Sequence, residues 1–232
     1  MENLKLYHYF NSDFSNMKNA MKRYGLWVLL IPALVSCGEE EFTGSGNIIT
    51  VIREVEAFSS IEANNALEVK VSQGPNQLVE VTVNDNLQNQ ILTQVSNGTL
   101  VIALVAGSFD NATFVVNVQV PDLDRFRLND ATRATISFDT DQLDLSVNDA
   151  ANLRLEGTAD TLNISSDNAA LVSGFSFSAD VVNVTSRGAS AIEITCNSEL
   201  NGTVRDAARV LYKGFPEIKA TTSDAGRITN SN

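Results

Sequence analysis

The second half of the chain repeats itself every 18–20 residues, and this short period restricts the folds that the chain can adopt. Six alanines mark the repeat, and they stand at Ala131, Ala150, Ala169, Ala189, Ala207 and Ala225. A unit of this length cannot bury an apolar face alone, so successive units must stack on one another. We therefore expect stacked coils that share one continuous core.

Within each unit, apolar and polar residues alternate with a period of two, which is typical of a strand with one buried face. Residues 143–147 (Leu-Asp-Leu-Ser-Val) and 153–155 (Leu-Arg-Leu) are examples. A turn of this length holds two or three short strands at about 3.3 Å per residue, and equivalent strands of successive turns would pair in parallel. The sequence thus predicts an all-β fold, a parallel β-helix or β-solenoid with turns of about 18–20 residues.

The position before each marker alanine holds a residue type that tolerates positive φ or forms Asx turns. These residues are Asp130, Asp149, Asn168, Gly188, Asp206 and Asp224. The alanine and the residue after it are small. We therefore predict a tight corner here, where the chain passes from one sheet to the next.

If the turns stack in register, an acidic row should follow this edge of the solenoid. Its members would be Asp130, Asp149, Asp167, Asp206 and Asp224. Carboxylates about 5 Å apart repel one another unless water, cations or arginines screen them. Three arginines two residues after their alanines could do so: Arg133, Arg209 and Arg227. The row is a candidate weak Ca²⁺ site. The alternative is that these residues serve only the turn, through their φ preference and by capping backbone N–H groups.

The first half of the chain has the same strand chemistry with less regular spacing. Strand-like runs lie at 48–52, 66–71, 78–83, 99–105 and 114–120, and Asn97-Gly98 is a hairpin or corner candidate. Residues 85–95 fit either a helical turn or a strand. We interpret this half as irregular turns that cap the end of the solenoid.

Four segments resemble one known family. The corners Ser186-Arg187-Gly188-Ala189 and Ser223-Asp224-Ala225-Gly226 resemble the Ser-Gly corners of a family of bacterial lipoproteins, the putative auto-transporter adhesins with a head GIN domain. Residues 53–61 are similar to that family's first strand, and residues 210–216 resemble its closing Tyr-x-Gly-x-Pro segment. The resemblance covers residues 47–232 and implies a β-solenoid, pectin-lyase-like in shape, with a role in adhesion. Most corners here carry Asp or Asn where relatives often have Gly.

The N-terminal segment indicates export and lipid attachment. Basic residues precede a short apolar run at 26–35, and Ser36 and Cys37 follow it, as in a secretory signal. Residues 34–37 (Leu-Val-Ser-Cys) resemble a bacterial lipobox, in which the cysteine is acylated. We predict lipid attachment at Cys37 in an outer-membrane lipoprotein, either surface-exposed or facing the periplasm. An ordinary signal peptide is the alternative.

These signals divide the chain into three parts. Residues 1–36 form the leader and signal peptide, in which translation could start at Met17; residues 37–46 form an acidic, Gly-rich tether, and residues 47–232 form the solenoid. The net charge of −12 becomes more negative when the leader, with four basic and two acidic residues, is removed. Such a charge argues against nucleic-acid partners.

The residue types needed for common catalytic sites are scarce. The single histidine, His8, lies in the leader, which removes Ser/His and Cys/His nucleophile pairs and most zinc sites from the mature chain. We expect no catalytic residues, no metal site of that kind and no cofactor. Cys196 alternates with isoleucines and is interpreted as a buried small side chain. Tyr212, Phe215 and Pro216 form the candidate exposed patch or end cap.

The sequence therefore predicts a lipid-anchored, non-enzymatic module of the cell envelope that acts in adhesion or surface interaction. Its partners would be the membrane, through the anchor, and a host or cell-surface glycan or protein; self-association is also open. Two alternatives remain: a carbohydrate-active β-helix enzyme (polysaccharide lyase or hydrolase) and a purely structural envelope protein.

Overall fold

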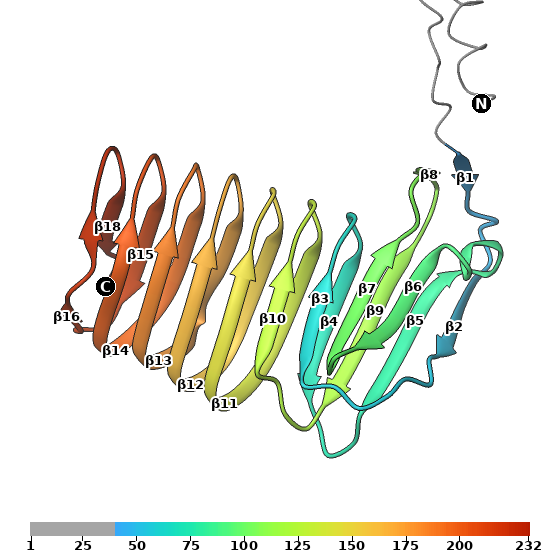
Figure 1. The fold of residues 1–232 in the computed structure, drawn as a ribbon, viewed down its shortest axis with the longest axis horizontal. Helices are drawn as coiled ribbons and strands as arrows, with labels where there is room; N and C mark the ends of the chain where they lie inside the picture. The colour runs from blue at the N-terminus through green and yellow to red at the C-terminus, as the bar shows by residue number, and fades with distance from the viewer. Residues whose placement is uncertain (1–39) are drawn as a thin grey trace, which may run out of the picture. The chain divides into compact units, whose positions relative to one another are not determined.

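A computed structural model describes residues 40–232, which are almost entirely β-structure (Figure 1). The strands are β1 (Glu41–Thr43), β2 (Ile48–Ile52), β3 (Ser60–Ala63), β4 (Glu68–Gln73), β5 (Leu78–Asn84), β6 (Ile91–Ser96), β7 (Thr99–Leu104), β8 (Ser108–Asp110), β9 (Phe114–Val120), β10 (Arg125–Leu128), β11 (Arg133–Val147), β12 (Asn152–Ser166), β13 (Leu171–Ser186), β14 (Ala191–Val204), β15 (Arg209–Lys213), β16 (Glu217–Ile218), β17 (Thr221–Thr222) and β18 (Arg227–Asn230). One 3₁₀ helix, η1, spans Asp85–Leu87. Within these described residues, no helix has the length and hydrophobicity that a membrane crossing needs.

The long strands β11 to β14 are coils of a solenoid, each contributing to two facing sheets (Figure 1). Their first halves pair in a back sheet with β4, β9, β15 and β18. Their second halves pair in a front sheet with β3, β7 and β10. Successive coils are parallel: Arg133 lies opposite Asn152, and Ala191 lies opposite Arg209. The predicted β-solenoid is thus confirmed, with about six turns.

The six predicted corners are confirmed by the backbone. Asp130, Asp149, Asn168, Gly188, Asp206 and Asp224 all have positive φ, between 52° and 68°. Two residues further on, the chain points a small side chain into the core, and these buried residues are Thr132, Ala151, Ala170, Ser190 and Ala208. A small side chain is needed here because both sheets converge at the corner, where little room remains between them.

The core is built from files of equivalent residues in neighbouring coils. Leu143, Leu162, Val182 and Leu200 lie opposite one another and are fully buried. Each such side chain contributes about 1.5–3 kcal/mol to folding when it leaves water. Elsewhere Gly157 lies opposite Phe138 on one neighbouring coil and opposite Phe177 on the other, and both phenylalanine side chains are buried.

The N-terminal turns do not stack in the order of the sequence. Strands β3 and β4 form one turn through a corner at Asn65 and Ala66, which both have positive φ. On one side this turn pairs with β10 and β11, and on the other side with β7 and β9. The turn made by β7 and β9, although later in the chain, is therefore the outer one.

Antiparallel strands cover this outer turn. β5 pairs with β9 and β2 pairs with β5 on the back sheet, while β6 pairs with β7 on the front sheet. Asn97 and Gly98 form the β6–β7 hairpin, both with positive φ. Residues 85–95, for which helix and strand were both open, contain the 3₁₀ turn η1 and then most of β6.

A small separate sheet lies beside the corner after β7. β1 pairs with β8, and the ring of Phe42 stacks on Phe109 with 5.2 Å between centroids. β1 lies within residues 37–46, the segment interpreted from the sequence as a tether. Phe42 gives this polar segment an apolar side chain that packs against the solenoid. The leader, the signal peptide and Cys37 lie outside the described residues.

Candidate functional site

The structure separates the five aspartates of the predicted corner row. Asp130, Asp149, Asp206 and Asp224 occupy the same corner position with the same left-handed backbone. Asp167 lies one position earlier, and Asn168 takes the corner place in that coil. The row of carboxylates is therefore interrupted at two successive coils, by Asn168 and by Gly188.

Asp167 instead forms an ion pair with Arg187 of the next coil. The Nε of Arg187 donates to Oδ2 of Asp167 at 2.6 Å. This hydrogen bond is the main reason why the pKa of Asp167 lies below its ordinary value. Within residues 40–232, none of Arg133, Arg209 and Arg227 forms an ion pair with a carboxylate.

Two corner aspartates bind hydrogen-bond donors from neighbouring coils. Asp149 accepts from the side-chain amide of Asn168, and Asp206 accepts from the backbone N–H of Gly188 at 3.1 Å. Over the described part of the chain, no group of three or more His, Cys, Asp or Glu side chains is placed to hold a metal ion. Cation binding by the corner row stays a prediction.

A second acidic row lies at the opposite edge, where each coil bends from the back sheet to the front sheet. The strand register places Asp141 of β11 opposite Asp160 of β12, and Asp160 opposite Asp180 of β13. All three are exposed, and Asn197 donates to Asp180 at 3.1 Å. Sequence reasoning missed this row, although its spacing of 19 and 20 residues is the period of the repeat.

The three residues of the candidate surface patch differ in exposure. Phe215 is 89% exposed, whereas Tyr212 is half-buried and packs against the core. Pro216 is also half-buried. Ile218, the other exposed apolar side chain nearby, lies on the two-residue strand β16. Phe215 is therefore the principal exposed part of this patch. Cys196 is buried and free, as predicted.

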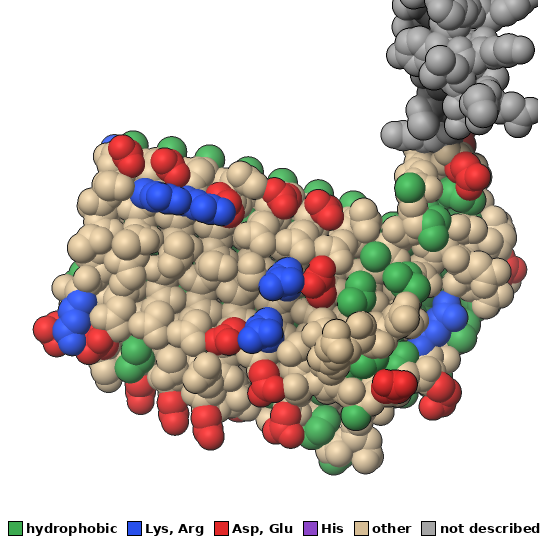
Figure 2. All heavy atoms as spheres, viewed as in Figure 1, with side chains coloured by type: hydrophobic (Ala, Val, Ile, Leu, Met, Phe, Trp, Pro, Cys, Tyr) green, Lys and Arg blue, Asp and Glu red, His purple; other side chains and the backbone are tan. Residues whose placement is uncertain are grey.

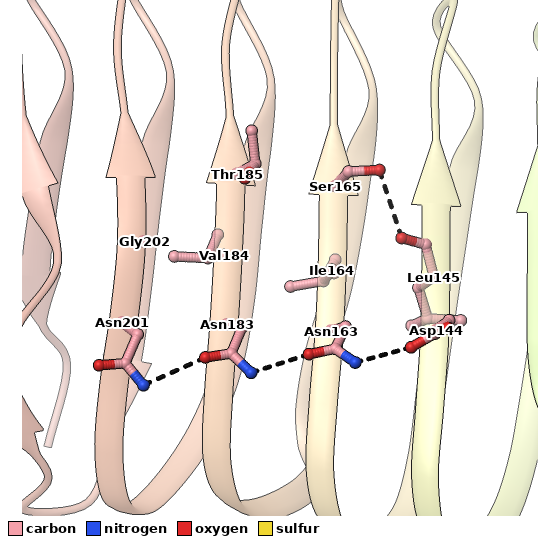
Figure 3. Close-up of a pocket in the computed structure, with 10 residues that line it drawn as sticks. All are labelled: Asp144, Leu145, Asn163, Ile164, Ser165, Asn183, Val184, Thr185, Asn201 and Gly202. Carbon is pink, nitrogen blue, oxygen red and sulfur yellow. Dashed lines mark hydrogen bonds between the residues drawn. The ribbon is translucent and has the colours of Figure 1, made fainter.

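A ladder of hydrogen-bonded side-chain amides crosses the front sheet (Figure 3). Asn163 donates to Asp144 at 2.7 Å, Asn183 donates to Asn163 at 2.8 Å, and Asn201 donates to Asn183 at 3.1 Å. We call these four residues, Asp144, Asn163, Asn183 and Asn201, the amide ladder. It crosses β11, β12, β13 and β14 along the solenoid axis, and in Figure 3 every amide nitrogen points toward the preceding coil.

A row of hydroxyl side chains runs beside the amide ladder, two residues further along each strand. Its members are Ser146, Ser165, Thr185 and Thr203. Between the two rows lies a shallow hollow of about 310 Å³, whose lining includes the ladder, Ser165, Thr185 and Gly202. Gly202 lies opposite the buried Val184 and contributes only backbone to this lining.

Charged residues lie at the borders of this surface. Figure 2 shows a broad area of mostly uncharged atoms on this face, with charged side chains in rows along its upper and lower edges and adjacent acidic and basic side chains near the middle of the view. At one end of the ladder, Arg125 lies 3.9 Å from Asp144. At the other end Lys219 pairs with Glu199, which lowers the pKa of Glu199 and raises that of Lys219.

A second hollow, of about 600 Å³, lies where the corner after β7 approaches the corner at Asn65. Its lining is largely apolar and includes Leu104, Val105, Phe109 and Phe114. The ladder and this hollow lie on different parts of the solenoid, since none of their lining residues is shared.

Comparison with known proteins gives a family and a fold. The sequence profile of the family described as "Putative auto-transporter adhesin, head GIN domain" matches residues 57–216. No curated protein matches the chain. A solved structure described as a putative adhesin from Bacteroides fragilis NCTC 9343 has a TM-score of 0.69 and 19% identity, and covers 82% of this chain and 100% of its own.

Two further solved structures are similar. A putative adhesin from Parabacteroides merdae ATCC 43184 has a TM-score of 0.54 at 15% identity, and covers 83% of this chain and 100% of its own. A protein from Parabacteroides distasonis ATCC 8503, described as a putative lipid binding protein, has a TM-score of 0.53 at 16% identity with the same coverage. At these identities the likeness establishes the solenoid fold.

Proposed function

The chain belongs to the putative auto-transporter adhesin family with a head GIN domain, and from this membership we propose that it is a non-enzymatic module that binds a partner at the cell surface. The resemblance drawn from the sequence is confirmed by the match over residues 57–216. The observation that carries the proposal is the front sheet, which presents ordered, outward-facing polar groups on a rigid solenoid.

Attachment to the outer membrane through a lipid on Cys37 is part of the proposal. It is supported by the sequence before the cysteine, Leu34-Val35-Ser36, and by the basic and apolar segments that precede it. Several acyl chains on one cysteine would hold the protein stably at a membrane. The solenoid would then display its front sheet to partners outside the bilayer.

Binding is tested with cells that produce the full chain. We expect such cells to adhere to immobilised host-cell surface material or to other bacteria more strongly than cells that lack the protein. Equal adhesion by both kinds of cells would contradict the proposal. Release of new reducing ends from polysaccharides by the purified chain would instead support the alternative carbohydrate-active enzyme.

Anchoring is tested by the substitution Cys37→Ser. Metabolic labelling with a radioactive fatty acid should mark the unsubstituted chain and leave Cys37→Ser unlabelled, and the variant should move from the membrane fraction to the soluble fraction. Protease treatment of intact cells then distinguishes a surface-exposed protein, which is digested, from one that faces the periplasm. Equal labelling of both chains would show that Cys37 is not the attachment site.

A further inference from the structure

We propose that the amide ladder is a binding site for an uncharged polysaccharide, whose chain lies along the solenoid axis across β11 to β14. The inference rests on the proposed function and makes it more specific, because it names the binding surface and the chemical class of the partner. Four observations carry it: the spare hydrogen-bonding capacity of the ladder, its spacing, its rigidity, and the neutral hollow beside it.

The ladder residues keep hydrogen-bonding groups free for a ligand. An asparagine amide has two N–H donors and an oxygen with two lone pairs. In the ladder, Asn163 and Asn183 each use one N–H toward the preceding coil and one lone pair toward the following coil. Each therefore retains one donor and one acceptor position. Sugar hydroxyl groups, which donate and accept at once, match this combination.

The spacing of the ladder is regular because it follows the strands. Neighbouring strands of a sheet lie about 4.8 Å apart, and Asn163, Asn183 and Asn201 stand on three neighbouring strands. One sugar unit of an extended β-1,4-linked chain advances by a comparable length, although neighbouring units face opposite ways. Alternate sugar units could thus present the same hydroxyl groups to the ladder, which a single compact ligand could not do.

The amides are held in place before any ligand arrives. The three hydrogen bonds fix the amide planes in one common direction (Figure 3). Asn163 is half-buried, and the backbone under the ladder is paired on both sides. Binding then immobilises few additional side chains, so little conformational entropy is lost when a ligand binds.

The hollow beside the ladder favours a neutral ligand. Its lining from Asn163 to Gly202 is uncharged, and Asp144, its only charged lining residue, is engaged by Asn163 and lies beside Arg125. The protein as a whole is acidic, with a net charge of −12. Polymers of uronic acids would be repelled by this field, whereas neutral sugars would not.

The test uses the full chain purified in detergent and affinity electrophoresis through gels that contain one polysaccharide each. The neutral probes are soluble β-1,4-glucan, β-1,4-xylan and β-1,4-mannan, and the acidic probes are polygalacturonate and alginate. We expect retardation by at least one neutral polymer and by neither acidic polymer.

The ladder is removed by the combined substitutions Asn163→Ala, Asn183→Ala and Asn201→Ala. Because all three asparagines lose the hydrogen bonds that they would make to the sugar hydroxyls, we expect the affinity to fall roughly tenfold or more. A second variant, Thr185→Arg, leaves the ladder intact and places a long side chain over the hollow from an exposed position. It should also lose binding, so the proposal does not depend on whether the triple variant folds.

The matched control removes three outward polar side chains of the back sheet: Thr135→Ala, Asn152→Ala and Ser173→Ala. It should bind as the unsubstituted chain does. Retention of binding by Thr185→Arg, binding only to acidic polymers, or no binding to any neutral polymer would overturn the inference. If cells still adhere through the protein in those cases, the proposed function stands while the ladder is not its site.

Discussion

The side-chain amide of Asn183 donates to the amide oxygen of Asn163, with 2.8 Å between the two atoms. The same side chain accepts a hydrogen bond from Asn201 at 3.1 Å. Asn183 therefore connects its coil to the coils on both sides. It does so with both polar atoms of its amide, because the nitrogen donates to one neighbour and the oxygen accepts from the other.

The first prediction concerns this double role. Asn183→Asp keeps the acceptor but loses the donor, and it places a carboxylate against the oxygen of Asn163. We expect both Asn183→Asp and Asn183→Ala to lower the free energy of unfolding by about 1–2 kcal/mol. Asn152→Ala, an exposed asparagine of the back sheet, should change it by less than about 0.5 kcal/mol. Urea unfolding measures all three, and equal stability of Asn183→Ala and the unsubstituted chain would contradict a stabilising ladder.

The second prediction concerns Gly157. This residue has a φ of +119°, and a Cβ there would collide with the carbonyl group of Phe138. Backbone strain and overpacking should together make Gly157→Ala less stable by about 2–4 kcal/mol. The control is Gly46→Ala, where φ is +82° and a Cβ would meet no atom within 4 Å, so only about 1 kcal/mol is expected. Thermal unfolding would show the difference, and similar losses in both variants would contradict the packing argument.

The third prediction concerns the ion pair between Asp167 and Arg187. Because the folded pKa of Asp167 lies below its unfolded value, the pair adds stability above about pH 4, and this contribution is lost as the pH falls through the folded pKa. Asp167→Asn should therefore be less stable than the unsubstituted chain at pH 7, by at most about 1 kcal/mol for a surface pair. The difference should shrink toward pH 3. Arg187→Gln should give the same profile, and a difference that does not depend on pH would rule out the ion pair as its cause.

The fourth prediction concerns Cys196, whose thiol is buried and lies 3.2 Å from the carbonyl oxygen of Glu199. Burial raises the pKa of this thiol, so the thiolate is scarce in the folded protein. In a Cys37→Ser chain, which leaves a single cysteine, a thiol reagent at pH 8 should react slowly with the native protein and rapidly in denaturant. The pKa of this thiol is lower in the unfolded chain than in the folded protein, so rising pH favours the unfolded chain. The free energy of unfolding should therefore fall as the pH rises above about 8.5. Rapid labelling of the native protein would contradict the burial.

The corners were the part of the fold that the sequence predicted best. Each corner requires a residue with positive φ, such as Asp149, followed by a small residue. Because local backbone geometry sets this requirement, the same residue pattern recurs in every coil of the repeat. The corner at Asn65 and Ala66 has the same geometry, but it was missed. The turn that contains this corner pairs with β10 and β11, whose residues lie 65 positions later in the sequence. Because β5 to β9 are inserted between the two turns, the spacing of about 19 residues that marks the repeat is absent here.

The candidate site was only partly predictable. The recurring Asn-x-Ser/Thr pattern at Asn163, Asn183 and Asn201 was visible in the sequence, but it gave no sign that the asparagines bind one another. Pairing depends on the register between coils, which a bulge in β13 shifts by one residue. Asp167 lies one position before the corner residue Asn168, which the sequence had already placed at the corner, so its carboxylate falls outside the corner position itself.

The turn formed by β3 and β4 has a consequence for how the protein reaches its native state. Both of its neighbours, β7 with β9 and β10 with β11, are made from residues that leave the ribosome later. The solenoid therefore cannot fold turn by turn from the N-terminus. The turn formed by β3 and β4 has no strand to pair with until the later strands on both of its sides have been synthesised. If the protein is exported as an unfolded chain, we expect folding to begin in the regular C-terminal coils. The turn formed by β3 and β4 would then pair with its neighbours last.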